Sequence, residues 1–225
     1  NSEKIVLDTS LEIIKEKERL LSLGSNEAET RRKIIDKILF GILGWDENDS
    51  SFEEAISEDG STTFSDYIIR TGMTAFIIEA KRIGKAETQV PDLRKAQLNR
   101  RFVNGDIGDI ITQARDYARK KSIPFAIATD GNYWIIFPAT RVDQVSFSDS
   151  FAIIFKDINS ALKDNYDEFY SLLSRDAVIS GSLENDLLGR IDNQIEQRRL
   201  NKFFNKSFSK IHRNNLFNLI EEAIN

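Results

Sequence analysis

The stretch FSDYIIRTGMTAFIIEAKR, residues 64–82, decides the expected fold and points to the expected site. Two apolar runs, rich in β-branched and aromatic residues, flank a Thr-Gly-Met turn, which is typical of a β-hairpin. Asp66, Glu79 and Lys81 lie inside these runs. An unpaired charge buried in an apolar sheet costs on the order of several kcal/mol. The pattern therefore predicts a site in which a metal ion and a substrate compensate the charges.

The geometry of a hairpin predicts how these charges are arranged. Side chains alternate across a strand, so Glu79 and Lys81 share one face. If Gly72 and Met73 form a two-residue turn, Asp66 lies directly opposite Glu79, with Cβ atoms about 4.5–5.5 Å apart. Two carboxylates at that distance repel, and a Mg²⁺ ion bound between them, with waters completing its octahedron, relieves the repulsion. A register slip of one residue would turn the two acids to different faces.

Lys81 suits phosphoryl chemistry on the same face. Its ammonium group could orient or activate an attacking water and offset the charge that develops on a phosphate, while the metal lowers the pKa of that water. The alternative is an ordinary charged cluster on a half-exposed strand. Isoleucines occur on both strands next to the charges, at positions 68, 69, 77 and 78. They favour a hairpin buried on both faces, and with it a metal-dependent nuclease site.

Composition restricts the chemistry further. The 225 residues include no cysteine and a single histidine, His212, and the net charge is −5. Disulfides and thiolate zinc sites are excluded, and catalysis by a Ser-His or Cys-His pair is close to impossible. An enzyme with this composition must use carboxylates, lysine and hard, oxygen-bound cations such as Mg²⁺. His212 is expected to face solvent or a partner helix.

The same composition indicates a cytoplasmic location and no membrane partner. Cysteine is absent, no secretory signal opens the sequence, and no apolar run approaches the roughly 18 residues of a membrane span. Because the first residue is Asn1 and not methionine, we expect the chain to be a piece of a longer protein.

The order of the expected elements predicts an α/β fold with a mixed central β-sheet flanked by helices. Hydrophobic periodicity and capping residues predict helices at 10–23, 27–43, 90–102, 109–121 and 160–174. Besides the first hairpin, strands are expected at 124–137, around the Asp130-Gly131 turn, and at 151–155. Residues 1–175 are predicted to form one domain. Residues 176–225, which are polar and helical in pattern, are predicted to be a helical extension or the start of a following domain.

Basic residues are concentrated directly after the acidic pair. From Ala80 to Lys121 there are eleven Lys and Arg against five Asp and Glu. A solvated helix surface is the usual explanation of such a run. Its position beside Glu79 favours a contact with nucleic acid instead.

At Asp66 and Glu79-Ala80-Lys81 the chain resembles the PD-(D/E)XK nuclease superfamily, with Ser65 in place of the proline that names it. More narrowly, the chain is similar to the N-terminal endonuclease domain of type I restriction enzyme motor subunits. Three further segments carry this narrower resemblance: NEAETRRKIIDKILFGILGW at 26–45, QARDYA at 113–118 and PFAIATDGNYWIIF at 124–137. The resemblance implies a restriction-endonuclease-like core.

The resemblance also implies roles for individual residues. Glu27 would complete the metal shell; Glu29 is a second candidate, although its spacing from Asn26 also fits a capping box. Gln113 would reach the active site, and Tyr117 would orient it or touch the DNA backbone, unless Tyr117 is a core aromatic.

Three arginines are further candidates for binding DNA phosphates: Arg82, Arg115 and Arg119. Each lies near the predicted site in the sequence. The alternative for each is a solvated helix face.

The predicted function is that of a Mg²⁺-dependent DNA endonuclease domain, with Mn²⁺ able to substitute. The resemblance implies a prokaryotic restriction or antiviral defence protein, joined to a motor or ATPase domain or to other restriction subunits. Two alternatives remain at this point. One is a non-catalytic nucleic-acid-binding module on a nuclease fold, and the other is an interaction domain that docks a partner through its helical tail.

Overall fold

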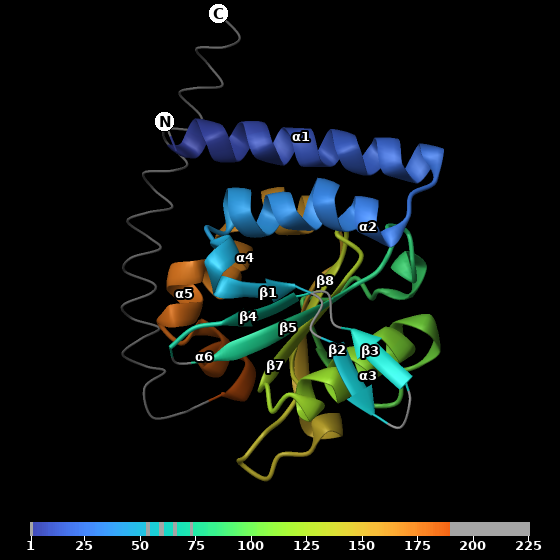
Figure 1. Cartoon of the computed structure of the whole chain (residues 1–225), viewed down its shortest axis with the longest axis vertical. Coiled ribbons are helices and arrows are strands. Elements are labelled where there is room, and N and C mark those ends of the chain that lie inside the picture. Colours follow the sequence, from blue (N-terminus) through green and yellow to red (C-terminus); the bar gives the residue numbers. More distant parts are fainter. Residues whose placement is uncertain (1, 53–54, 59–60, 65–66, 73, 190–225) are drawn as a thin grey trace, which may run out of the picture.

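The computed structural model describes residues 2–52, 55–58, 61–64, 67–72 and 74–189 (Figure 1). The main strands in these ranges are β1 (Ser50–Phe52), β4 (Tyr67–Arg70), β5 (Ala75–Ala80), β6 (Lys95–Gln97), β7 (Phe125–Thr129), β8 (Trp134–Pro138) and β9 (Phe151–Phe155). Within the described ranges they form a seven-stranded sheet in the order β1-β4-β5-β7-β8-β9-β6. The pair β5 and β7 is parallel, and the other neighbouring pairs are antiparallel.

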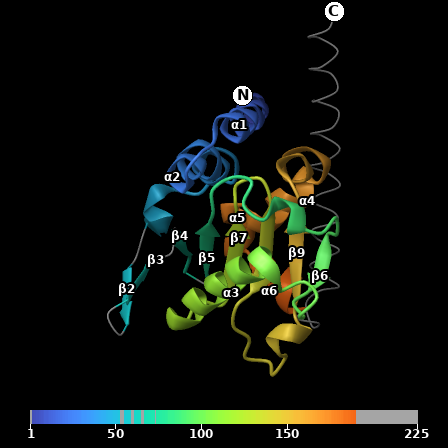
Figure 2. The same cartoon turned by 90° about the vertical axis from the view of Figure 1, so that its right-hand side faces the viewer.

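A smaller hairpin stands beside this sheet. Its strands, β2 (Ala55–Glu58) and β3 (Ser61–Phe64), pair with each other in antiparallel fashion. Figure 2 shows the hairpin extending away from the body of the protein.

Helices cover both faces of the main sheet. One face carries α1 (Ser2–Leu23), α2 (Glu27–Thr30) with its π-helical continuation to Ile42, α4 (Tyr166–Leu173), α5 (Arg175–Ile179) and α6 (Ser182–Leu188). The other face carries α3 (Gly105–Lys120). This arrangement confirms the predicted α/β class with a mixed sheet flanked by helices (Figure 1).

Strict alternation along the strands builds two hydrophobic layers. On β5, Phe76 and Ile78 are buried in the layer that includes α2, its π-helical continuation and α4, whereas Ile77 between them is buried under α3. On β8, Trp134 and Ile136 join the first layer and Ile135 the second. A strand with both faces covered needs apolar residues at successive positions. That requirement explains why the hairpin and the 124–137 segment read as continuous apolar runs.

The register predicted for the first hairpin is confirmed. Tyr67 pairs with Ile78 and Arg70 with Ala75, as a two-residue turn at Gly72-Met73 requires. The Thr71 hydroxyl accepts the backbone N–H of Thr74 at 2.9 Å and helps to close the turn. Asp66 lies outside the described residues, so its predicted position opposite Glu79 stays a prediction.

The helix start predicted at Asn26 is also confirmed. The Asn26 side chain accepts the backbone N–H of Glu29 at 2.8 Å. The helix then continues through π-helical turns, Arg31–Ile35 and Lys37–Ile42, and Gly44 ends it with a φ of 74°.

The helix predicted at 90–102 is wrong. The chain there forms a short 3-10 turn, Glu87–Gln89, and the edge strand β6, which pairs with β9. Pro91 does not explain the difference, because proline is tolerated in the first turn of a helix. The edge of β9 offers the segment a ladder of backbone partners. Pairing between distant segments therefore overrides the local helical pattern. The neighbouring helix α3 begins at Gly105 and not at Asp109 as predicted.

The turn of the second hairpin is longer than its Asp-Gly pair suggested. Thr129 pairs with Trp134, so four residues connect β7 to β8. Gly131 has a φ of 82°, and a Cβ there would lie 2.9 Å from the Ile34 side chain. Glycine is therefore needed both for the left-handed backbone and for the close approach of the continuation of α2.

The first part of the predicted C-terminal extension packs on the sheet. Val178 of α5 and Leu183 and Leu187 of α6 are buried in the same layer as Trp134. Residues 190–225, including His212, lie outside the described ranges, and the division of the chain near residue 175 stays a prediction. Within the described ranges, no helix has both the length and the apolarity that crossing a bilayer requires.

Candidate active site

Glu79 and Lys81 form an ion pair at the end of β5. Glu79 is 2% exposed, and the Lys81 Nζ lies 2.5 Å from its Oε1. Alternation places Glu79 on the same face as Ile77, which is the face that α3 covers. Because a buried carboxylate needs a positive partner, Lys81 compensates Glu79 directly, and the two residues share one face as predicted.

The pair lies where two parallel strands end. Glu79 of β5 is opposite Ala128 of β7, and the Lys81 N–H donates to the Thr129 carbonyl at 2.8 Å. The carboxyl ends of parallel strands are the usual place for ligand sites in α/β sheets. We call this the catalytic edge, defined by residues 79–82 and 128–130.

Asp130 anchors the chain that leaves the catalytic edge. Its Oδ2 accepts the backbone N–H of Gly84 at 2.8 Å. Its Oδ1 accepts those of Asn132 at 2.9 Å and Tyr133 at 3.0 Å. The carboxylate therefore fixes the turn between β7 and β8 and holds the segment after Lys81 against it.

Two neighbouring side chains extend this anchor. Asn132 donates from its amide to Glu87 Oε1 at 2.6 Å and accepts the backbone N–H of Ile158 at 3.1 Å. The Thr30 hydroxyl accepts the backbone N–H of Ile83 at 3.0 Å. Asp130, Asn132 and Thr30, which we call the anchor network, thus join the segment after Lys81 to α2 and to the chain before α4.

Burial dominates the electrostatics of Asp130. The side chain is fully buried, and this raises the pKa of its carboxyl from 3.8 to about 7, although the backbone N–H groups of Tyr133, Asn132 and Gly84 oppose the rise. Glu87 nearby raises the pKa further. Asp130 is therefore a structural carboxyl that changes charge near neutral pH.

The sequence singled out only part of this network. The sequence predicts a turn at Asp130, and the bonds from Asn132 and Tyr133 to its side chain are those of an Asx turn. Its bond to Gly84 spans 46 residues. Thr30 lies in the segment 26–45 that carries the family resemblance, but the sequence predicts no role for it.

A divalent cation fits the chemistry of Glu79. Carboxylate oxygens are the ligands that Mg²⁺ prefers, and Glu79 lies at the catalytic edge beside Lys81. In the part of the chain that the structure describes, no group of three or more acidic or histidine side chains is arranged to hold a metal. The second predicted ligand, Asp66, lies outside that part.

Glu27 is exposed on the first turn of α2, and the backbone N–H of Glu29 donates to the side chain of the capping residue Asn26. Thr30, on the same turn, is tied to Ile83 just past Lys81. This bond brings α2 to the catalytic edge, although α2 covers the opposite face of the sheet from Glu79. Glu27 and Glu79 could therefore bind the same cation only if the Glu27 side chain reached past the edge of the sheet. The metal role of Glu27 stays a prediction.

Gln113 and Tyr117 lie on α3, which packs on the face that carries Glu79. Gln113 is exposed, whereas Tyr117 is 2% exposed and belongs to the layer beneath α3. For Tyr117 the structure thus shows the packing role that was the alternative. Contacts of either residue with substrate stay predictions.

The three candidate arginines do not lie together. Arg82 follows Lys81 and is exposed at the catalytic edge. Arg115 and Arg119 lie near the end of α3, beside the residues that follow β8. Phe125 and Pro138 mark that end of the sheet, three residues before Ala128 along β7, or about 10 Å at ~3.3 Å per residue. Arg82 is thus the candidate beside Glu79.

Comparison with known proteins gives one structural likeness. No protein-family model and no curated protein matches the chain. Among solved structures, it is similar to a fragment of a putative HsdR subunit of a type I restriction enzyme from Vibrio vulnificus, with 19% sequence identity and a TM-score of 0.35. The similarity covers 60% of this chain and 24% of that one.

Proposed function

We propose that this chain is a Mg²⁺-dependent DNA endonuclease domain with a site of the PD-(D/E)XK type. One observation carries the proposal: a carboxylate that is 2% exposed, Glu79, contacts Lys81 where the parallel strands β5 and β7 end. The sequence resemblance supports Asp66 as the second acid. It also supports a place in a cytoplasmic restriction or defence system that includes a motor or ATPase.

The chain's own residues would bind and orient the DNA at this edge. Glu79, with Asp66, would hold the cation, which polarises a phosphodiester and makes a bound water more acidic. Lys81 is fixed by Glu79 at 2.5 Å. From that position its ammonium would donate to a phosphate oxygen and stabilise the negative charge that grows during attack. Arg82, exposed next to it, would bind a flanking phosphate.

The anchor network would keep this arrangement rigid. Asp130 holds Gly84 and Thr30 holds Ile83, so the backbone is fixed within three residues of Lys81. Catalysis depends on groups that are held in place before the reaction begins.

A second candidate function is a non-catalytic nucleic-acid-binding module. The ion pair between Glu79 and Lys81 favours it, because Lys81 by itself compensates the charge of Glu79. The two functions differ in whether a divalent cation leads to strand cleavage.

Cleavage of supercoiled plasmid DNA tests the proposal. We expect the full chain to nick or linearise the plasmid with Mg²⁺ or Mn²⁺ and to leave it intact in EDTA, because the cation is needed to activate the water. A gel-shift measurement with the same DNA runs in parallel. DNA binding without cleavage in Mg²⁺ or Mn²⁺ would favour the binding module, and cleavage that persists in EDTA would contradict the metal-dependent mechanism.

A further inference from the structure

A second basic site lies at the other end of the sheet from the catalytic edge. A pocket of about 210 Å³ is bounded by Arg115 and Arg119 of α3 and by Thr140, Arg141 and Phe147 of the chain after β8. In Figure 2 the loop that follows β8 lies at the bottom of the protein, and the segment that follows β5 lies toward the top. We call this pocket the α3–β8 pocket.

Arg115 is held in this pocket by stacking. Its guanidinium carbon lies 3.9 Å from the centre of the Phe147 ring, and Phe147 packs edge to face on Phe137 at 6.1 Å. The side chain is half-buried, and its Nε is buried with no hydrogen-bond partner among the described residues. The Nε atom is covered, so a ligand in the pocket would be met by the rest of the guanidinium group, which the Phe147 ring holds in place.

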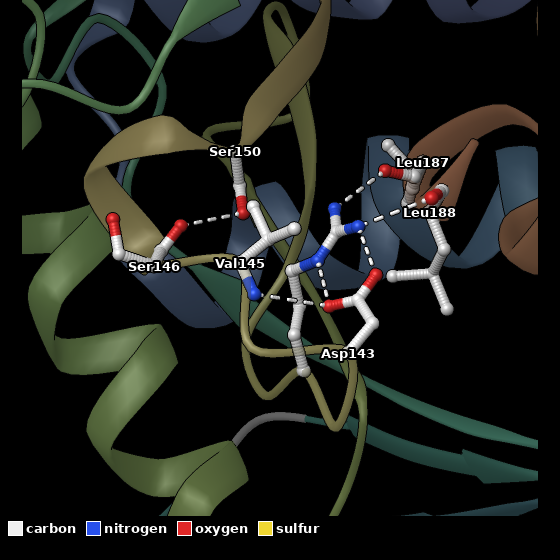
Figure 3. Close-up of polar contacts among 7 residues, drawn as sticks. Asp143, Val145, Ser146, Ser150, Leu187 and Leu188 are labelled. Carbon is white, nitrogen blue, oxygen red and sulfur yellow. Dashed lines mark hydrogen bonds and ion pairs between the residues drawn. The ribbon is translucent and has the colours of Figure 1, made fainter.

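Arg141 in the same pocket shows the opposite situation. Its guanidinium pairs with Asp143 and donates to the carbonyls of Leu187 at 3.2 Å and Leu188 at 3.1 Å (Figure 3). These bonds tie the loop after β8 to the end of α6. They also neutralise the Arg141 charge within the protein. Arg141 therefore forms a wall of the pocket and is already paired. Arg115, by contrast, has an N–H group, that of Nε, without a hydrogen-bond acceptor among the described residues.

Arg119 adds a second positive charge beside Arg115. The two are four residues apart and therefore lie on one side of α3. The contact of Arg119 with Asp116 is long, at 4.0 Å, and both side chains are more than half exposed, so it is weak. Burial and the charge of Arg119 lower the pKa of the Arg115 guanidinium. An anion between the two arginines would relieve that repulsion.

We propose that the α3–β8 pocket binds a phosphate group through Arg115 and Arg119, with the Thr140 hydroxyl as a further donor. The planar guanidinium fork matches two oxygens of a phosphate. The phosphate is carried either by a small molecule or by a nucleic-acid backbone. This site is separate from Glu79 and Lys81, and its existence does not depend on the proposed nuclease activity.

NMR titration of the ¹⁵N-labelled full chain with inorganic phosphate, at constant ionic strength, tests this site. We expect saturable shifts of the backbone amides of Thr140 and its neighbours. Arg115→Gln should weaken the affinity at least about 10-fold, since it removes charge-assisted hydrogen bonds. Arg119→Gln alters only an exposed side chain and should weaken binding in the same direction without affecting folding. Arg101→Gln, the same charge change at an exposed position outside the pocket, is the matched control and should bind as the wild type.

Two further arms identify the source of the phosphate and separate this proposal from the nuclease. Saturation by a nucleoside monophosphate, without shifts from duplex DNA, indicates a small ligand, whereas shifts of the same amides by duplex DNA indicate a backbone phosphate. Loss of the Thr140 shifts in Arg115→Gln bears on the pocket alone, whereas loss of plasmid cleavage in Lys81→Ala bears on the nuclease alone. Unsaturable shifts, or equal affinity in the wild type and in both the Arg115→Gln and Arg119→Gln variants, would overturn the proposal.

Discussion

Lys81→Ala is expected to lower Mg²⁺-dependent DNA cleavage by about 10²–10⁴-fold, the range found when a positioned proton donor or charge-stabilising group is removed. The Lys81 ammonium lies 2.5 Å from Glu79 and is 19% exposed. It is therefore both fixed and able to reach a phosphate at the catalytic edge. Alanine removes this donor and leaves the backbone bond from Lys81 to Thr129 in place.

The effect must be separated from a loss of folding. Removing one member of a buried ion pair can destabilise a protein by about 3–5 kcal/mol. The double variant Glu79→Gln/Lys81→Met removes both charges, so it should keep more stability than Lys81→Ala and be equally inactive. Lys85→Ala, which breaks only an exposed ion pair with Asp106 at 3.3 Å, is the matched control.

Plasmid cleavage rates and urea unfolding are measured on the same preparations. The expected pattern is near-normal cleavage by Lys85→Ala and cleavage lowered at least about 10²-fold in the other two variants, with the double variant still folded. Cleavage by Lys81→Ala at the wild-type rate would refute the assigned role of Lys81.

The second large effect concerns Asp130 and the pH dependence of stability. Burial raises the pKa of its carboxyl from 3.8 to about 7 in the folded protein. Between these values the folded state holds a proton that the unfolded chain has released. The contribution of Asp130 to the free energy of unfolding is therefore largest below about pH 4 and falls as the pH rises to about 7. The full difference amounts to about 4 kcal/mol.

Asp130→Asn isolates this contribution, because asparagine does not titrate. Its amide can accept from Asn132 and Tyr133 but cannot replace the bond from Gly84, so we expect a lower stability than that of the wild type at about pH 5, where the Asp130 carboxyl is protonated. Urea unfolding of both proteins at about pH 5 and about pH 8 measures the effect. The wild type should lose more stability between the two pH values than the variant. Equal losses would show that Asp130 does not titrate in this range.

The hairpin was predictable because its information is local. Apolar residues on both faces and a glycine at the turn determine the pairing of Tyr67 with Ile78. The same reasoning placed Glu79 and Lys81 on one face. It did not reveal that Lys81 itself neutralises Glu79, because strand alternation gives the face of a side chain and not its rotamer.

The parts that failed depend on contacts between distant segments. Residues 95–97 form a strand because β9 offers an edge, and the local pattern of charges gives no sign of this. Arg115 lies near Arg82 in the predicted basic segment, but α3 carries it to the other end of the sheet. Asp130 contacts Gly84 only because β5 and β7 run parallel and end together.

Mn²⁺ titration followed by NMR line broadening tests the central claim most directly, because it detects the metal site whether or not the chain cleaves DNA by itself. In the wild type, low Mn²⁺ concentrations should broaden the backbone amide signals of Glu79, Ala80 and Lys81 first. The isosteric variant Glu79→Gln should abolish this selective broadening. Broadening that leaves these three amides unaffected, or that persists unchanged in Glu79→Gln, would contradict a metal-dependent site at the end of β5.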